Sequence, residues 1–263
     1  MSLGEVFFSE ILGTGMLLLL GGGVVANVLL TKSKGKDGGW LLINMGWGLA
    51  VMAGVFLAYK SGAHLNPAVT IGVLASGADA YAPDVDITFA STLVYFAGQM
   101  IGAFLGACLV FLTYRKHFEE EEDEQRKLWV FSTAPEIRNY GWNFVTEVIG
   151  TFVLVIVVLS FGNTPHQLGP LAVALLVVGI GASLGGPTGY AINPARDLGP
   201  RIAHAVLPVQ HRVRAAVGVG AAAAGELAPT RPHKDSDWGY AWVPVVGPLI
   251  GGAIAGLLAQ VVF

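Results

Sequence analysis

Two copies of one sequence pattern organise this chain: Ser61-Gly62-Ala63-His64-Leu65-Asn66-Pro67-Ala68 in its first half and Thr188-Gly189-Tyr190-Ala191-Ile192-Asn193-Pro194-Ala195 in its second. Each copy ends in Asn-Pro-Ala. Asparagine is a strong helix N-cap and proline suits the first helical position, so one helix is predicted to begin at Pro67 and another at Pro194. These helices extend only to about Ser76 and about Leu207. Ten helical residues cover about 15 Å, half of the ~30 Å hydrocarbon core of a bilayer, so each segment is predicted to be a half-helix.

The rest of the chain has the composition of a membrane protein. Of its 263 residues, 54 % are hydrophobic and 13 % are charged, whereas soluble proteins carry about 25 % charged residues. Six apolar windows are predicted to span a bilayer: Val6–Leu30, Trp40–Tyr59, Ile87–Leu112, Asn143–Phe161, Leu168–Leu184 and Tyr240–Phe263. We therefore predict an all-α protein of the plasma membrane, with six transmembrane helices and two re-entrant half-helices. Its net charge of −3 gives no indication of a nucleic-acid partner.

The two motifs belong to an internal duplication. Ser9-Glu10-Ile11-Leu12-Gly13-Thr14 in the first span matches Thr146-Glu147-Val148-Ile149-Gly150-Thr151 in the fourth. Three spans per half is an odd number, so the halves enter the membrane with opposite orientations. Inverted repeats with interrupted helices place their shared site near the bilayer midplane. The predicted organisation is a single channel domain, residues 1–263, with a first repeat at 5–112, a connecting loop at 113–142 and a second repeat at 143–263.

The pair of half-helices predicts a pore. Both helix N-termini meet near the midplane in this arrangement, each equivalent to roughly +0.5 charge. The side-chain amides of Asn66 and Asn193 then project donors into a lumen, orienting a passing hydroxyl group and opposing cations. Extended backbone at membrane depth is tolerated where it lines a cavity. We expect pore-lining carbonyl groups from Gly62, Ala63, His64, Leu65, Gly189, Ala191 and Ile192.

Two carboxylates lie within the apolar windows, and an arginine directly follows the second motif. Glu10 and Glu147 occupy matching positions of the repeat, and an intramembrane acid has two interpretations. In the first interpretation, each carboxylate accepts hydrogen bonds from backbone N–H groups of the loop in its own half, and the symmetry of the repeat favours this role. In the second, one of the two carboxylates is a proton-coupling site. Arg196 directly follows the second motif. We expect its guanidinium to face the lumen rather than simply to pair with Asp197, because its fixed donors would bind hydroxyl groups and repel cations.

Two further segments are polar. The acidic run Glu119–Glu124 in the connecting loop is interpreted as a solvated face. The segment Pro208–Lys234 holds an alanine-rich apolar run too short to span a bilayer, so we expect a surface excursion or partial disorder there.

With these residues in place, the chain resembles the aquaporin superfamily and, within it, the bacterial glycerol facilitators. The resemblance rests on the paired Asn-Pro-Ala motifs and on residues 61–70, and it covers nearly the whole chain. It implies a homotetramer with one pore per subunit and cytoplasmic termini. Most of the basic residues then lie outside, contrary to the positive-inside rule.

The resemblance also implies where the narrowest ring of the pore lies. It assigns an aromatic/arginine selectivity filter to Trp47, Gly181, Tyr190 and Arg196. Water-selective relatives carry histidine where this chain has Gly181, so the ring is expected to be wider here and to suit linear polyols. Three more positions agree with the glycerol branch: Asp197, Arg201 and Pro244.

The predicted function is passive diffusion of glycerol and related small uncharged solutes, with some water permeability, and not catalysis. Dihydroxyacetone, urea, hydrogen peroxide and protonated lactic acid are further candidate solutes. No cofactor or metal is expected, because His64 lacks histidine, cysteine or carboxylate companions at ligand spacing. Two alternatives remain open: a water-selective aquaporin, and an ion-coupled secondary transporter that uses Glu10 or Glu147 as its proton site.

Overall fold

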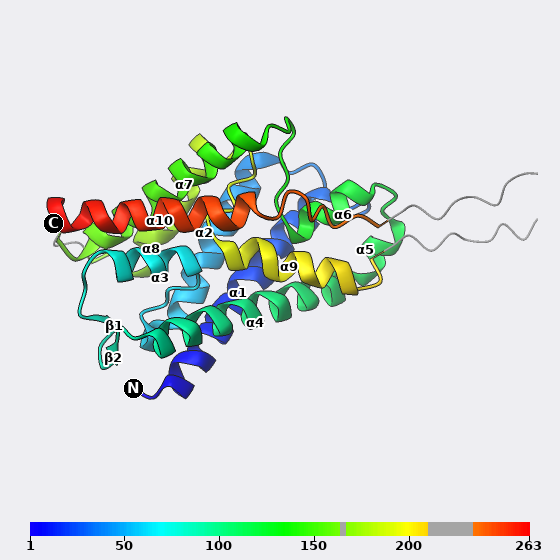
Figure 1. The fold of residues 1–263 in the computed structure, drawn as a ribbon. Helices are drawn as coiled ribbons and strands as arrows, with labels where there is room; N and C mark the ends of the chain where they lie inside the picture. The colour runs from blue at the N-terminus through cyan, green and yellow to red at the C-terminus, as the bar shows by residue number, and fades with distance from the viewer. Residues whose placement is uncertain (164–166, 210–233) are drawn as a thin grey trace, which may run out of the picture.

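The computed structural model describes residues 1–163, 167–209 and 234–263. The described helices form an elongated bundle, and both chain termini lie at the same end of it (Figure 1). Within those ranges, five helices are long and apolar enough to cross a bilayer. They are α1 (Leu3–Leu29), α2 (Gly39–Leu57), α4 (Phe89–Thr113), α7 (Tyr140–Ser160) and α10 (Val243–Val262).

The sixth predicted span is the shorter helix α8 (Pro170–Leu184). Its 15 residues cover about 22 Å, less than the thickness of the hydrocarbon core. Pro170 stands at the first helical position, after Gly169 with a φ of 52°. The chain turns at these two residues, so the helix begins later than the apolar window at Leu168. Short 3-10 turns, η1 (Tyr59–Ser61) and η2 (Phe161–Asn163), follow α2 and α7.

Both predicted half-helices are present, as α3 (Pro67–Ala75) and α9 (Pro194–Val206). Asn66 caps α3 by accepting the Ala68 N–H at 2.8 Å. Asn193 caps α9 by accepting two N–H groups, from Ala195 at 3.0 Å and Arg196 at 3.2 Å. Capping thus fixes both tripeptides at helix N-termini, as their sequence predicts.

Close helix packing sets the frame around the half-helices. Contacts are most extensive between α1 and α4 and between α7 and α10, the corresponding helix pairs of the two repeats, and α2 packs on α8. Each half-helix packs mainly on a span of the other repeat: α3 lies on α10, and α9 lies on α4. The two halves therefore interlock around one centre.

The connecting segment is more ordered than the predicted loop. It contains α5 (Arg115–Glu120) and α6 (Glu124–Phe131), which lie at the opposite end of the bundle from the termini (Figure 1). The interpretation of the acidic run as a solvated face is wrong for Glu121, which is 2 % exposed and accepts the N–H and hydroxyl group of Thr31 at 3.0 and 2.9 Å. Burial opposes its ionisation, but these bonds and the Asp123 N–H lower the pKa of Glu121 below its ordinary value.

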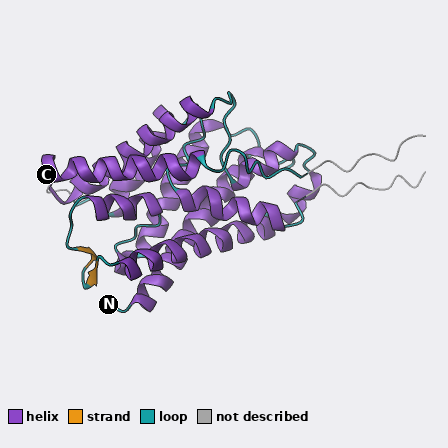
Figure 2. Ribbon diagram, in the orientation of Figure 1, coloured by secondary structure: helices purple, strands orange, loops and turns teal. Residues whose placement is uncertain are grey.

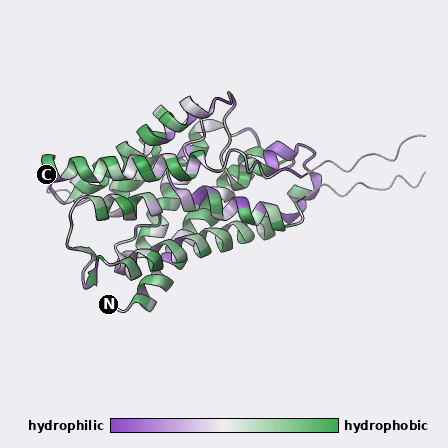
Figure 3. Ribbon diagram, in the orientation of Figure 1, coloured by the Kyte–Doolittle hydropathy of each residue, from purple (hydrophilic) through white to green (hydrophobic). Residues whose placement is uncertain are grey.

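Other features of the described chain are minor. A two-stranded hairpin, β1 (Ala80–Ala82) and β2 (Val85–Asp86), lies near the N-terminus (Figure 2). Apolar residues dominate the long helices, whereas α6 begins with four polar residues and is more hydrophilic (Figure 3). Most of the predicted excursion Pro208–Lys234 lies outside the described residues.

Candidate functional site: a pore between the two half-helices

The loops that precede α3 and α9 have matching backbones. Gly62 and Gly189 have φ angles of 79° and 80°. The residues that follow also have positive φ angles at matching positions. The φ angles are 53° at Ala63 and 38° at Tyr190, and 54° at Leu65 and 42° at Ile192. Non-glycine residues in this left-handed region cost about 1–3 kcal/mol each and persist only where their surroundings hold them.

Glu10 holds the first loop from its buried position on α1. Its Oε1 accepts the Ser61 hydroxyl group at 2.6 Å and the His64 N–H at 3.1 Å. Its Oε2 accepts the Leu65 N–H at 2.8 Å and the Gln99 amide at 2.9 Å. The carboxylate therefore satisfies two backbone donors that the left-handed loop cannot pair within itself.

Glu147 makes the corresponding contacts from α7. Its Oε1 accepts the Thr188 hydroxyl group at 2.7 Å and the Ala191 N–H at 3.0 Å, and its Oε2 accepts the Ile192 N–H at 2.8 Å. Both carboxylates thus serve the loop of their own repeat. This geometry is what the structural interpretation of the two acids requires.

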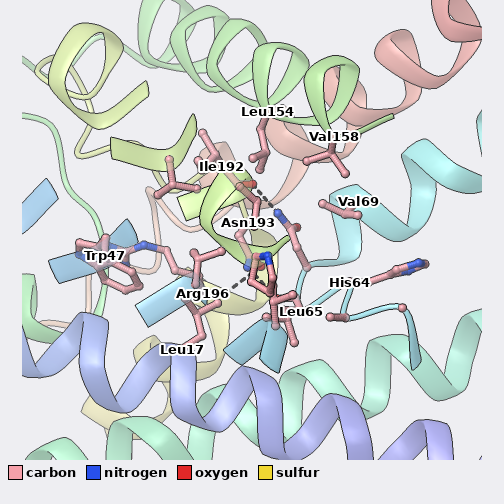
Figure 4. Close-up of a pocket in the computed structure, with 18 of the residues that line it drawn as sticks. Leu17, Trp47, His64, Leu65, Val69, Leu154, Val158, Ile192, Asn193 and Arg196 are labelled. Carbon is pink, nitrogen blue, oxygen red and sulfur yellow. Dashed lines mark hydrogen bonds between the residues drawn. The ribbon is translucent and has the colours of Figure 1, made fainter. Parts of the chain in front are cut away.

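The two motifs bind each other by a reciprocal pair of hydrogen bonds. The Asn66 side-chain amide donates to the Ile192 carbonyl group, and the Asn193 amide donates to the Leu65 carbonyl group, each at 2.8 Å (Figure 4). Each amide group has a second hydrogen, for which the described residues provide no acceptor. Because both asparagines line a cavity, these second hydrogens are available to a solute.

Two cavities, each of about 350 Å³, meet at three side chains. We call the cavity that contains Asn66 and Asn193 the motif cavity. The other, which we call the loop cavity, is lined by residues of the connecting segment, including Trp129 and Thr133. Three of the four predicted filter residues line both cavities, and so lie where the cavities join: Trp47, Tyr190 and Arg196.

The lining of the motif cavity combines two kinds of residue. The polar lining comes from the motif asparagines and the loop residues from Gly62 to Leu65, with Ala191 and Ile192 from the second loop. The lining that comes from the spans is apolar: Leu17, Val51, Val55, Leu154, Val158, Val173 and Val177. The sequence prediction did not include this apolar lining. A spacing of four residues, as from Trp47 to Val51 and Val55, could have indicated it, because residues i and i+4 share one helix face.

Gly181, the fourth predicted filter residue, lies behind Tyr190 and is not among the described residues that line either cavity. A Cβ atom there would come within 2.7 Å of the Tyr190 ring and within 2.4 Å of Asn44 Oδ1. The missing side chain therefore makes room for the phenol group of Tyr190. Gly181 therefore acts on the junction of the two cavities only through its contact with Tyr190.

Arg196 and Trp47 are in direct contact at the junction of the cavities. The guanidinium carbon lies 4.0 Å from the centroid of the Trp47 ring, a cation–π distance (Figure 4). No described residue accepts a hydrogen bond from this guanidinium. Its donors thus remain available to a solute, and they do not bind Asp197.

Asp197 and Arg201 instead form a buried clamp. Arg201 donates to Asp197 at 2.8 Å and also to the carbonyl groups of Thr133 and Ser236, at 2.9 and 2.7 Å. Asp197 accepts the Thr133 N–H and hydroxyl group, both at 2.8 Å. The clamp therefore joins α9 to the segments before α7 and α10.

A second ion pair lies nearby. Arg138 donates to Asp237, and this hydrogen-bonded carboxylate raises the pKa of Arg138 above its ordinary value.

Other predicted positions support the pore without facing it. Pro67 and Pro194 begin the half-helices, and Ala68 and Ala195 are fully buried behind them. Pro244 is buried in α10 and lies outside the linings of the two cavities. His64 contributes only its backbone to the cavity. Its ring binds Thr70 and the Tyr81 carbonyl group, at 3.0 and 3.2 Å, and stacks on Tyr95. Gly189 lines the loop cavity rather than the motif cavity.

The cavities offer hydrogen-bonding groups but no metal site in the part of the chain that the structure describes. No group of three histidine, cysteine or carboxylate side chains there could hold a metal ion. Amides, carbonyl groups and one guanidinium, set among apolar side chains, are groups that can bind small polar solutes.

Comparison with known proteins defines the class to which this architecture belongs. The sequence pattern of the family described as "Major intrinsic protein" matches residues 2–259. The chain belongs to this family, whose members are membrane channels and not enzymes. It is accordingly a multi-pass integral protein of the plasma membrane.

Three proteins with extensive similarity refine the comparison. A probable glycerol uptake facilitator protein of Thermotoga maritima is 47 % identical over 262 residues, 98 % of this chain and 100 % of that protein. The glycerol uptake facilitator protein of Streptococcus pneumoniae is 48 % identical over 95 % of this chain and 96 % of its own length. The crystal structure of the aquaglyceroporin from Plasmodium falciparum matches with a TM-score of 0.75 and 31 % identity, covering 98 % of this chain and 96 % of that one.

Proposed function

We propose that this protein is a passive channel for glycerol and similar small uncharged solutes, with some water permeability. The observation that carries the proposal is the mixed lining of the motif cavity, in which amides and carbonyl groups of the loops meet aliphatic side chains of the spans. Glycerol has the same mixed character, because its hydroxyl groups project from a carbon backbone. A solute that loses water in the pore needs replacement hydrogen bonds, since an unpaired polar group costs roughly 2–7 kcal/mol.

The polar and apolar lining residues have different tasks in this proposal. The second amide hydrogens of Asn66 and Asn193 bind the solute hydroxyl groups, and the loop carbonyl groups accept from them. At the junction, the Arg196 guanidinium donates to hydroxyl groups while the rings of Trp47 and Tyr190 contact the carbon backbone. Cations are opposed by the guanidinium and by the two helix N-termini.

The similarity to glycerol uptake facilitators supports the choice of solute. Dihydroxyacetone, urea, hydrogen peroxide and protonated lactic acid remain candidate secondary solutes, since each is small and uncharged. We also propose a homotetramer with one pore per subunit. The organisation into repeats at 5–112 and 143–263 within one channel domain belongs to the same proposal, supported by the matched loops and half-helices.

Proteoliposomes in an osmotic shrink–swell assay test the function. Vesicles with the protein are expected to re-swell in glycerol at least tenfold faster than empty vesicles, and water flux is expected to rise less. Glycerol permeability no higher than in empty vesicles would overturn the proposal. A large rise in water permeability alone would identify a water-selective channel instead.

The same vesicles distinguish the ion-coupled alternative. Passive diffusion is linear with glycerol concentration over a wide range and insensitive to a protonophore. Both buried glutamates are engaged by loop donors, which favours the passive mechanism. Collapse of glycerol uptake on addition of a protonophore would favour a proton-coupled transporter.

A further inference from the structure

A buried amide behind the constriction has no partner. Asn44 lies on α2, one helical turn before Trp47, and is fully buried. Neither its Oδ1 nor its Nδ2 has a hydrogen-bond partner among the described residues. A buried amide without partners is costly, and such groups in native proteins are almost always paired.

The hydroxyl group of Tyr190 has the same property. It is buried, and no described residue pairs with it. Its oxygen lies 2.8 Å from the position that a Cβ atom would take at Gly181, and Asn44 Oδ1 lies 2.4 Å from that same position. The two unpaired groups therefore converge on one point, beside a residue that has no side chain to separate them.

We propose that Asn44 is a positioning residue for the filter: its amide holds the hydroxyl group of Tyr190 by a hydrogen bond. The bond forms directly when the Asn44 amide group rotates about its terminal side-chain torsion, which has a low barrier. Otherwise one water molecule bridges the amide and the hydroxyl group. Asn44 itself touches no solute, since it lines neither cavity. This inference rests on the proposed function, because it concerns the width of the same constriction.

The rest of the phenol ring is already fixed on its other side. Trp40 meets the Tyr190 ring edge-on, at 5.7 Å between centroids, and its Nε1 donates to the Gly181 carbonyl group at 3.0 Å. A hydrogen bond at the tip would add the remaining constraint. With Trp40 at the ring and Asn44 at the hydroxyl group, Tyr190 would keep a single orientation toward Trp47 and Arg196.

A double-mutant cycle tests the link. Asn44→Leu removes the amide with little change in size, Tyr190→Phe removes only the hydroxyl group, and the third variant carries both changes. The readout is the ratio of the permeability of erythritol, a four-carbon polyol, to that of glycerol. This ratio reports the width of the constriction, because erythritol is the larger solute. Each single variant is expected to raise this ratio about fivefold, the effect of one lost hydrogen bond, and the double variant no further than either single variant.

Met45→Leu is the matched control, because Met45 is the next residue of α2 and is exposed on the outside of the bundle. Its ratio should equal that of the unmodified protein. Effects of Asn44→Leu and Tyr190→Phe that multiply in the double variant would overturn the proposal, and so would an unchanged ratio in Asn44→Leu.

A second readout does not depend on transport. In detergent, each single variant should lower the midpoint of thermal unfolding by about 3 °C, and the double variant should lose less than the two losses combined, because no orphaned partner remains. Fully additive losses would overturn the link even in a protein that conducts glycerol well. Conversely, absence of glycerol flux in the unmodified protein would refute the proposed function while the unfolding cycle still decides the role of Asn44.

Discussion

Glu10 and Glu147 each accept hydrogen bonds from backbone N–H groups with both carboxylate oxygens. A backbone N–H group can only donate, so its partner has to be an acceptor. In the first repeat these donors are His64 and Leu65, and in the second they are Ala191 and Ile192. An amide side chain has one oxygen and one NH₂ group. A glutamine at either position would therefore set its NH₂ group against a backbone N–H in both of its possible orientations.

We accordingly predict that Glu147→Gln destabilises the protein by about 1–3 kcal/mol, the cost of one buried unsatisfied donor. Chemical unfolding in detergent measures this loss, and glycerol flux should fall with it because the Ile192 loop moves. Glu122→Gln, on an exposed residue of the connecting segment, is the control and should change neither. If Glu147→Gln is as harmless as the control, the carboxylate does not hold the loop.

Sequence reasoning at this scale recognised residues that a repeat displays twice. The two glutamates, the two asparagines and their loops were found because each occurs in both halves. Asn44 and Gln99 occur only once, in apolar windows, and nothing in their local sequence indicates which loop or ring they face. Their partners come from distant segments, so tertiary structure alone reveals them.

At the scale of elements, the asparagine of each motif serves a half-helix in two separable ways. Its Oδ1 caps its own helix, whereas its Nδ2 binds the loop of the other repeat. Serine is also a good N-cap but has no amide. Substitution at Asn66 can therefore remove the link between the repeats and keep the cap.

We predict that Asn66→Ser destabilises the protein by about 1 kcal/mol and Asn66→Ala by about 2 kcal/mol, since alanine loses the cap as well. Unfolding in detergent gives both values. Glycerol permeability should drop by a similar amount in the two variants, because both lose the donor in the motif cavity. Equal destabilisation by serine and alanine would show that the cap contributes nothing to α3.

Helix contacts at glycine give a second prediction for the elements. An added Cβ atom would lie 2.5 Å from the Ile11 carbonyl oxygen at Gly102, and 2.4 Å from the Val148 carbonyl oxygen at Gly251. These are corresponding positions on α4 and α10, where small residues let helix backbones approach closely. At Gly179 on α8, by contrast, an added Cβ atom meets nothing within 4 Å.

Gly102→Ala and Gly251→Ala should each cost about 2 kcal/mol or more, because a backbone oxygen cannot move aside. Gly179→Ala, the control, should be neutral or stabilise by up to about 1 kcal/mol through better helix propensity. Thermal unfolding of the three variants checks the order. A loss at Gly179 equal to the others would mean that helix flexibility, not close packing, accounts for the effect.

The spanning helices and the two half-helices were predictable, whereas α5 and α6 were not. A run of about twenty apolar residues predicts each spanning helix, and an Asn-Pro pair predicts the start of each half-helix. The helices α5 and α6 have no such signal, since helices this short are marginal without tertiary contacts. Tertiary contacts hold them in place: Glu121 accepts from Thr31, and the rings of Phe118 on α5 and Phe131 on α6 pack with their centroids 5.6 Å apart.

At the scale of the whole molecule, the contacts between the two repeats are expected to make each half depend on the other. Each half-helix packs on a span of the opposite repeat, and each motif donates a hydrogen bond to the opposite loop. The buried salt bridge of Asp197 and Arg201 also binds the connecting segment through Thr133. A half alone would expose these buried polar groups in lipid, where each unsatisfied group is costly.

We therefore predict that the fragments 1–121 and 122–263, each expressed alone, yield no stable protein and no glycerol flux. Co-expressed, they should assemble and recover about half of the flux of the intact chain, because the cut falls between α5 and α6 and leaves the Asp123 cap of α6 in place. Co-purification through a tag on one fragment, followed by the shrink–swell assay, measures both outcomes. A cut within α4, between Gly102 and Ala103, is the control and should abolish assembly by breaking a spanning helix. If fragment 1–121 alone is stable and monodisperse in detergent, the contacts between the repeats are dispensable and each repeat is a domain of its own.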